Sequence, residues 1–145
     1  MSMNKITSVI LAAGKGTRMK SARAKVLHEV FYRPMIHHVL DAAMAAGITH
    51  HAVIVGHQRE RVEAVLQKYD YTPVIQKEQL GTGHAVLCAE EACQDAELVM
   101  ILCGDTPLIR PETLQAMINQ HAQQQATVTL MTTTLDNPFG YGRII

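Results

Sequence analysis

Ser8-Val9-Ile10-Leu11-Ala12-Ala13-Gly14-Lys15-Gly16-Thr17-Arg18-Met19 runs from an apolar segment into a turn with two glycines. The apolar residues 8–11 predict a buried first strand. Glycines after such a strand leave backbone N–H groups open to an anion. Three basic residues accompany the turn, namely Lys15, Arg18 and Lys25. Their side chains suit phosphate oxygens, so the segment predicts a nucleoside triphosphate site. A solvated glycine turn with basic neighbours is the alternative.

Two well-known phosphate loops do not fit this turn. A Walker loop has the pattern G-x-x-x-x-G-K-[ST], and a dinucleotide-binding loop has G-x-G-x-x-G. Counted from Gly14, Met19 stands where both patterns require a glycine. The sequence therefore predicts a phosphate site of another type.

The composition limits the class of protein. The chain has 145 residues, of which 48% are hydrophobic, so we expect one small folded domain. A formal net charge of zero argues against broad nucleic-acid binding. No basic and then apolar leader is present, and no apolar run approaches the roughly 20 residues that a membrane span needs. We therefore predict a cytoplasmic protein without a membrane partner.

The spacing of cysteines and histidines does not indicate a metal centre. Cys88, Cys93 and Cys103 are odd in number and lack C-x-x-C spacing, so we predict reduced, mostly buried thiols. The pairs His37-His38 and His50-His51 are neighbours in sequence, and such neighbours point to different faces of a helix or strand.

Apolar runs alternate with helical patterns along the chain. We expect strands over 7–12, 51–56, 73–76, 98–103 and 127–134, and helices over 34–46, 58–69, 83–94 and 111–123. Thr82 is a candidate cap for the third helix, and Pro111 suits the first turn of the fourth. This order predicts an α/β fold: a mostly parallel sheet with helices on both faces and ligands at the C-terminal ends of its strands.

Asp105 follows the apolar run 98–102 and Gly104, where a buried strand reaches the expected binding edge. A carboxylate there suits Mg²⁺, which takes one or two carboxylates together with phosphate oxygens. The alternative is that Asp105 only caps the turn before Pro107.

The segment Gln76-Lys77-Glu78-Gln79-Leu80-Gly81-Thr82-Gly83-His84-Ala85 joins a strand end to a helix start. The amide of Gln76 offers a donor and an acceptor, which suit the imide edge of a pyrimidine. Gly81 and Thr82 bring main-chain groups and a hydroxyl to the same place. A plain helix start is the alternative.

Three loops at expected strand ends thus hold phosphate donors, a base-binding amide and a metal carboxylate. Together with the segment Gly140-Tyr141-Gly142-Arg143-Ile144, they resemble the N-terminal uridylyltransferase region of the bacterial bifunctional enzymes that make UDP-N-acetylglucosamine. The first motif is common to many sugar-phosphate nucleotidyltransferases, whereas residues 79–85 and 140–144 are more specific to these enzymes.

The resemblance implies a Rossmann-like nucleotide-diphosphosugar transferase fold. It also implies a reaction of UTP with N-acetylglucosamine 1-phosphate, giving UDP-N-acetylglucosamine and pyrophosphate with Mg²⁺. Site residues carried over from the family fall into groups by role: Leu11, Ala12, Ala13 and Gly14 for uridine; Gly16, Thr17, Arg18 and Lys25 for the phosphates, with Arg18 and Lys25 catalytic; Gln76, Gly81 and Thr82 for uracil; Asp105 for Mg²⁺, flanked by Cys103 and Gly104; and Gly140 for the sugar.

The chain departs from the family pattern at two positions. Ala24 precedes Lys25 where the family usually has proline, and Cys103 stands where tyrosine is common. The family's second metal ligand, its other sugar ligands and its acetyltransferase domain find no counterpart in residues 1–145. We therefore expect an incomplete N-terminal part of a nucleotidyltransferase domain that binds nucleotide with little or no turnover. A natural domain ending in an edge strand is the alternative. Family resemblance also implies a homo-oligomeric, trimeric parent protein.

Two other functions stay open. The generic first motif also fits transfer of CMP or another nucleotide to a sugar phosphate. The missing ligands also fit a non-catalytic domain that binds nucleotide sugars for regulation.

Overall fold

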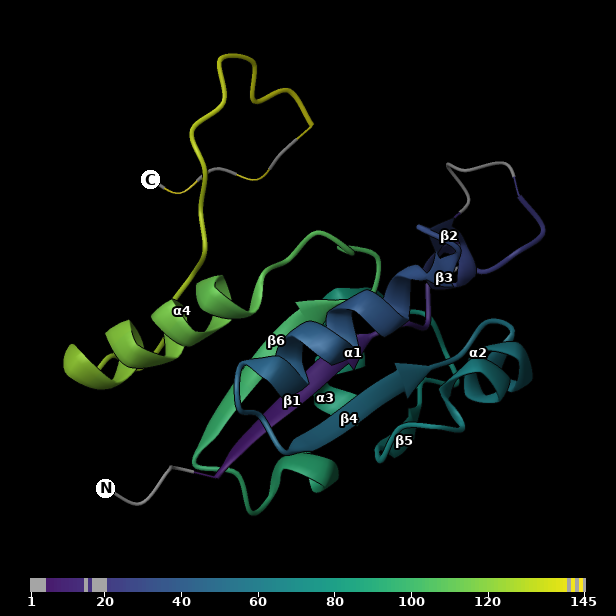
Figure 1. Ribbon diagram of the computed structural model, residues 1–145, viewed down its shortest axis with the longest axis horizontal. Coiled ribbons are helices and arrows are strands. Elements are labelled where there is room, and N and C mark those ends of the chain that lie inside the picture. Colours follow the sequence, from purple (N-terminus) through teal and green to yellow (C-terminus); the bar gives the residue numbers. More distant parts are fainter. Residues whose placement is uncertain (1–4, 15, 17–20, 141, 143, 145) are drawn as a thin grey trace.

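Four parallel strands form the centre of the molecule in the computed structural model, which describes residues 5–14, 16, 21–140, 142 and 144. They lie in the order β5-β4-β1-β6 (Figure 1). Their bounds are Ile6–Leu11 for β1, His50–Val55 for β4, Thr72–Ile75 for β5 and Leu98–Cys103 for β6. The first four predicted strands are thus confirmed, three of them shifted by one residue.

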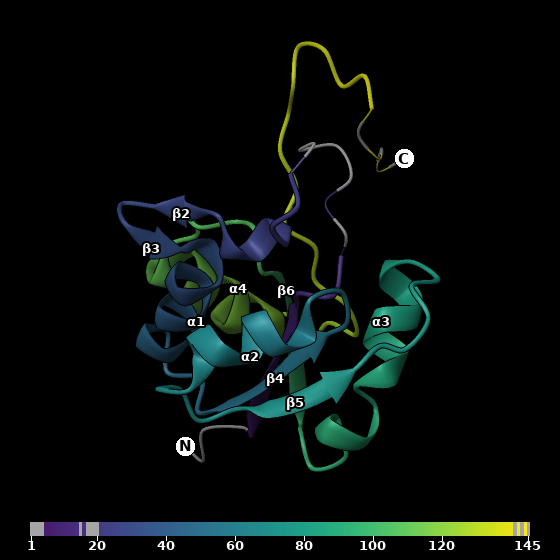
Figure 2. The same cartoon turned by 90° about the vertical axis from the view of Figure 1, so that its right-hand side faces the viewer.

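Helices cover both faces of this sheet (Figure 2). They are α1 (Met35–Ala45), α2 (Arg59–Leu66), α3 (Thr82–Cys88) and α4 (Pro111–Gln123). Shorter elements are the 3₁₀ helices η2 (Lys25–Leu27) and η3 (Glu91–Cys93), and a hairpin of β2 (Glu29–Val30) and β3 (Arg33–Pro34). The predicted parallel α/β architecture is confirmed.

Alternation along β1 explains the two layers. Ile10 packs with Val53 and with α1 and α2 on one face, whereas Val9 packs with Ile54 and with α3 on the other. Successive residues of a strand point to opposite faces. Because both faces of the two central strands are covered, their sequences are nearly continuous apolar runs.

The third helix differs from its prediction. Residues 83–94 form α3 and then the separate turn η3. Thr82 is the first residue of α3 rather than its cap, because Gly81 occupies the N-cap position and no side chain caps the helix. Pro111 does stand in the first turn of α4, as predicted.

The predicted strand over 127–134 is wrong. These residues carry no strand, and Val128, Leu130 and Met131 are exposed. The segment leaves the end of α4 and extends away from the sheet (Figure 1). A strand needs a neighbour's backbone donors and acceptors. In the described part of the chain β6 pairs with β1 on one side, and residues 127–134 form no ladder with its other side.

The cysteines of the described chain are free thiols. The prediction that they are mostly buried is wrong, because Cys88 and Cys93 are half-buried and Cys103 is exposed. Within the described ranges no helix is long and apolar enough to cross a membrane.

Candidate nucleotide-binding site

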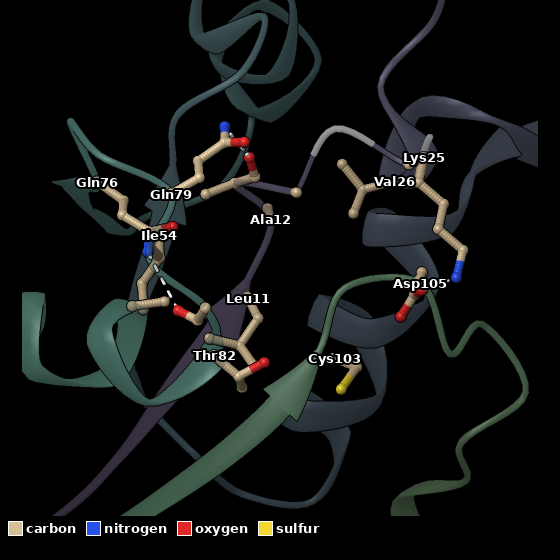
Figure 3. Close-up of a pocket in the computed structure, with 15 residues that line it drawn as sticks. Leu11, Ala12, Lys25, Val26, Ile54, Gln76, Gln79, Thr82, Cys103 and Asp105 are labelled. Atoms are coloured by element: carbon tan, nitrogen blue, oxygen red, sulfur yellow. Dashed lines mark hydrogen bonds and ion pairs between the residues drawn. The ribbon is translucent and has the colours of Figure 1, made fainter. Parts of the chain in front are cut away.

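A cavity of about 420 Å³ opens at the C-terminal edge of the sheet (Figure 3). Parallel strands place their C-terminal ends at one edge, so the loops that follow β1, β5 and β6 meet there. The residues around the cavity come from these loops, from the ends of the strands including β4, and from η2 and α3: Leu11, Ala12, Ala13, Gly14, Gly16, Lys25, Val26, Ile54, Gln76, Gln79, Gly81, Thr82, Ala85, Cys103 and Asp105. The structure therefore brings together eleven of the predicted site residues.

The first loop turns tightly at Gly16. Its φ is +61°, and a Cβ at this position would lie 3.0 Å from the Cβ of Lys25. Glycine fits here for two reasons, since it accepts positive φ and leaves room for the returning chain. Thr17 and Arg18, which the sequence assigns to the phosphates, lie outside the described residues.

Lys25 and Asp105 form an ion pair on one side of the cavity (Figure 3). Lys25 begins η2, and Asp105 follows the end of β6. Both side chains are only partly exposed, at 43% and 25%. The two charged groups predicted for phosphate and metal are therefore held next to each other, each neutralising the other.

Cys103 lies beside this pair at the end of β6. Partial burial of its thiol raises the pKa, the nearby Asp105 carboxylate acts in the same direction, and Lys25 opposes them. The thiol is therefore protonated near neutral pH, which makes it a poor nucleophile and metal ligand. Its role in the cavity is that of a small neutral wall.

Gln76 lies at the opposite side of the cavity and is 5% exposed. Its amide nitrogen donates to the Gly81 carbonyl oxygen at 3.3 Å and lies 3.0 Å from Nδ1 of His84. With the amide hydrogens directed into these contacts, the carbonyl oxygen is the Gln76 group best suited to meet a ligand. This differs from the expectation that Gln76 offers both a donor and an acceptor.

Gln79 belongs to the site although the sequence did not single it out. Its amide nitrogen donates to the Ala13 carbonyl oxygen at 2.8 Å, which ties the third loop to the first. Its place in the motif 76–85 was the available signal. The apolar residues Val26, Ile54 and Ala85 were missed as well, because only the folded packing shows that they reach the cavity.

Two predicted residues do not line the cavity. Gly104 is buried directly beside it, and its N–H donates to the Leu11 carbonyl oxygen at 3.0 Å. Gly140 is exposed in the C-terminal segment, apart from the cavity. The structure therefore does not bring the expected sugar contact to the other site residues.

The chain is similar in sequence and fold to known proteins. The family model described as the MobA-like NTP transferase domain matches residues 8–143. The chain belongs to this family. The name of this family states its class of chemistry, which is the transfer of a nucleotide from a nucleoside triphosphate.

Curated relatives of this NTP transferase chain carry the name bifunctional protein GlmU. That of Desulfotalea psychrophila is 57% identical over 143 residues, which are 98% of this chain and 42% of the relative. That of Geotalea daltonii is 48% identical over 145 residues, which are 99% of this chain and 32% of the relative. The chain thus spans less than half the length of these relatives.

Solved structures share the fold of this NTP transferase domain. A nucleotidyl transferase from Methanothermobacter matches with a TM-score of 0.74 and 25% identity, over 80% of this chain and 57% of its own. A UDP-glucose pyrophosphorylase from Acinetobacter matches with a TM-score of 0.68 and 24% identity, over 83% and 53%. The Rossmann-like nucleotidyltransferase fold predicted from the sequence is therefore confirmed.

Proposed function

We propose that this chain forms the nucleotide-binding part of a uridylyltransferase site. The reaction joins UTP and N-acetylglucosamine 1-phosphate to give UDP-N-acetylglucosamine and pyrophosphate. The observation that carries the proposal is the single cavity in which the first loop, the Gln76 loop and the Lys25–Asp105 pair meet. Similarity to the GlmU proteins over 98% of the chain supports the choice of substrates.

The chemistry is a displacement at the α-phosphorus of UTP. An oxygen of the sugar phosphate forms the new P–O bond while the bond to the β-phosphate breaks and pyrophosphate leaves. The attacking phosphate monoester is already largely ionised near neutral pH, so no general base is needed. Two anions must approach each other, and the site therefore acts through positioning and charge neutralisation.

Lys25 and Asp105 have complementary roles in this scheme. Without nucleotide they satisfy each other. When the triphosphate enters, the Lys25 ammonium turns to the phosphate oxygens, and the Asp105 carboxylate is released to bind a cation. Arg18 is proposed to join Lys25 on the phosphates.

Mg²⁺ fits the donor chemistry at Asp105. A single carboxylate beside a phosphate site is a usual magnesium ligand set, because the phosphates and water complete the coordination. The protonated Cys103 thiol beside it does not compete for the ion. When bound, Mg²⁺ supplies charge neutralisation for the phosphates.

Uracil recognition is proposed for the buried end of the cavity. In this proposal the Gln76 oxygen accepts from the imide N–H of uracil, and the contacts of its amide nitrogen with Gly81 and His84 support that role for the oxygen. Cytosine carries no hydrogen at that ring nitrogen and leaves the oxygen unpaired. A buried acceptor without a partner costs about 1–3 kcal/mol, so UTP is favoured over CTP.

A calorimetric titration with UTP, CTP and GTP tests this function. We expect UTP to bind best, and Lys25→Ala to weaken UTP binding about 10- to 100-fold, because a charge-assisted hydrogen bond contributes roughly 1.5–3 kcal/mol. Lys68→Ala, on the exposed surface after α2, is the matched control with no expected effect on affinity. Equal UTP affinity in the native chain and Lys25→Ala would refute the site.

A non-catalytic nucleotide-sugar-binding domain is the second candidate, favoured by the position of Gly140 away from the cavity. Release of pyrophosphate from UTP and the sugar phosphate by the whole parent protein excludes it. We also propose, from the family resemblance, that the parent protein is a cytoplasmic homo-oligomer and that this chain by itself binds nucleotide with little turnover.

A further inference from the structure

We propose that Gln58 is a positioning residue for Lys25. In this account its side chain fastens residues 22–24, which we call the returning segment, to the turn between β4 and α2. The proposal rests on the proposed function, because the consequence of placing Lys25 is phosphate binding. It adds a residue outside the cavity on which the site depends.

Both ends of the Gln58 amide bind the returning segment. The Ala24 N–H donates to Oε1 of Gln58 at 2.9 Å, and Nε2 of Gln58 donates to the Ala22 carbonyl oxygen. The partners are 34 and 36 residues away in the sequence. One side chain thus pairs a donor and an acceptor of the same short segment, which fixes both its position and its direction.

The backbone of Gln58 is in a conformation that side chains disfavour. Its φ and ψ are 56° and 38°, the left-handed region, and it is the N-cap residue of α2. Glycine adopts this region most easily. Backbone strain at a residue that makes two long-range hydrogen bonds indicates a role for its side chain.

The chain before the glycine turn and the chain after it both form hydrogen bonds with the β4–α2 turn. The His57 N–H donates to the Ala13 carbonyl oxygen at 3.3 Å, so the β4–α2 turn holds the outgoing limb as well. On the returning limb, the Leu27 N–H donates to the Ala24 carbonyl oxygen at 3.0 Å, which begins η2. Ala24 is fully buried and directly precedes Lys25. Fixing Ala24 therefore sets the direction in which the Lys25 side chain leaves the backbone.

Alanine at position 24 makes the bond to Gln58 possible, because its backbone N–H is the donor. Proline, the usual residue of the resembling family, stiffens the backbone but has no N–H to donate. Ala24 has φ of −55° and ψ of 139°, which proline also adopts. Here the Ala24 N–H bonded to Gln58 takes over the task of holding the segment.

The variant Gln58→Gly separates this role from folding. The two hydrogen bonds of the Gln58 amide, which we call the clamp, are lost in this variant. Because glycine relaxes the left-handed backbone, it offsets part of that loss, and the urea midpoint should fall only modestly. We expect UTP affinity to fall about tenfold because Lys25 is no longer held in place, whereas uridine, without phosphates, should bind as before. Lys25→Ala should then cost less in the Gln58→Gly background than in the native chain. Adding Ala24→Pro to the Gln58→Gly variant should recover part of the UTP affinity that Gln58→Gly loses.

Gln67→Gly is the matched control, since the same side chain is removed at the other, exposed end of α2. It should leave UTP affinity unchanged even where stability falls. If Gln58→Gly binds UTP as the native chain does while Lys25→Ala binds weakly, the positioning role is overturned and the nucleotide site stands.

Hydrogen exchange tests the clamp without a ligand. The Ala24 amide should be protected in the native chain and exchange at least about tenfold faster in Gln58→Gly. Unchanged exchange overturns the proposal. If the native chain does not bind UTP, the proposed function fails. Protection of the Ala24 amide would then show that Gln58 holds the segment in place, without a role in nucleotide binding.

Discussion

Gly104 illustrates how closely three parts of the chain approach at the end of β6. A Cβ on Gly104 would lie 2.9 Å from the Leu11 carbonyl oxygen and 3.0 Å from Cγ1 of Val26. The first is backbone of β1 and cannot move without disturbing the sheet. Gly104 therefore lets the end of β6, just before Asp105, pack against the start of the first loop.

We expect Gly104→Ala to lower the free energy of unfolding by about 1–3 kcal/mol, the cost of overpacking a filled site. Gly83→Ala is the control, because Gly83 lies in α3 and a Cβ there meets no heavy atom within 4 Å. That change should be neutral or raise the free energy by up to about 1 kcal/mol. Urea denaturation measures both, and an equal response of the two variants would contradict the packing described for Gly104.

Residue types of the site were predictable from the sequence, but their partners were not. Lys25, Asp105 and Gln76 carry functional groups whose chemistry is visible in the sequence, and all three line the cavity. The pairing of Lys25 with Asp105 depends on how the loops fold back. The clamp from Gln58 to Ala24 joins residues 34 apart, and no local pattern encodes such a contact.

The β2–β3 hairpin carries backbone strain at its tip. Phe31 and Tyr32 have φ of 49° and 62°, and they are 79% and 96% exposed. A two-residue turn with positive φ at both positions favours Asn-Gly. Because the aromatic rings are exposed, they gain little packing energy to offset this strain. We therefore expect residues 31 and 32 to lower the stability of the hairpin.

The double variant Phe31→Asn/Tyr32→Gly should raise the free energy of unfolding by about 1 kcal/mol, because the new residues accept the turn without strain. Phe139→Asn removes another exposed aromatic ring, at 87% exposure, outside the hairpin. It should have little effect on stability. Thermal unfolding of the variants provides the comparison, and a lower midpoint for the double variant would show that the aromatic residues stabilise the hairpin.

Elements were predictable where the pattern was long and the partner close. The four strands of the sheet and the helices α1 and α4 match their expected ranges within one residue at most positions. The segment 127–134 has the β-branched composition of a strand but lies away from the edge of β6 (Figure 1). Strand formation depends on a partner as well as on propensity, and propensity alone misled the prediction there.

At the scale of the whole molecule, a parallel sheet explains why loops from distant parts of the sequence form one site. Its C-terminal edge holds the cavity of about 420 Å³ with Lys25 and Gln76. Another cavity, of about 230 Å³, lies at the opposite edge and is lined by polar residues that include His51 and Asp70. The formal net charge of zero does not distinguish these two edges; the residues that line each cavity do.

A map of backbone amide chemical shifts on addition of UTP with Mg²⁺ tests whether nucleotide binds at the C-terminal edge of the sheet. We expect shifts in the described residues of the first loop, in Gln76–Thr82 and in Cys103–Asp105, and none at the opposite edge. Shifts centred on Thr49–His51 and Asp70–Thr72, or no shifts at all, would contradict a nucleotide site at the C-terminal edge of the sheet.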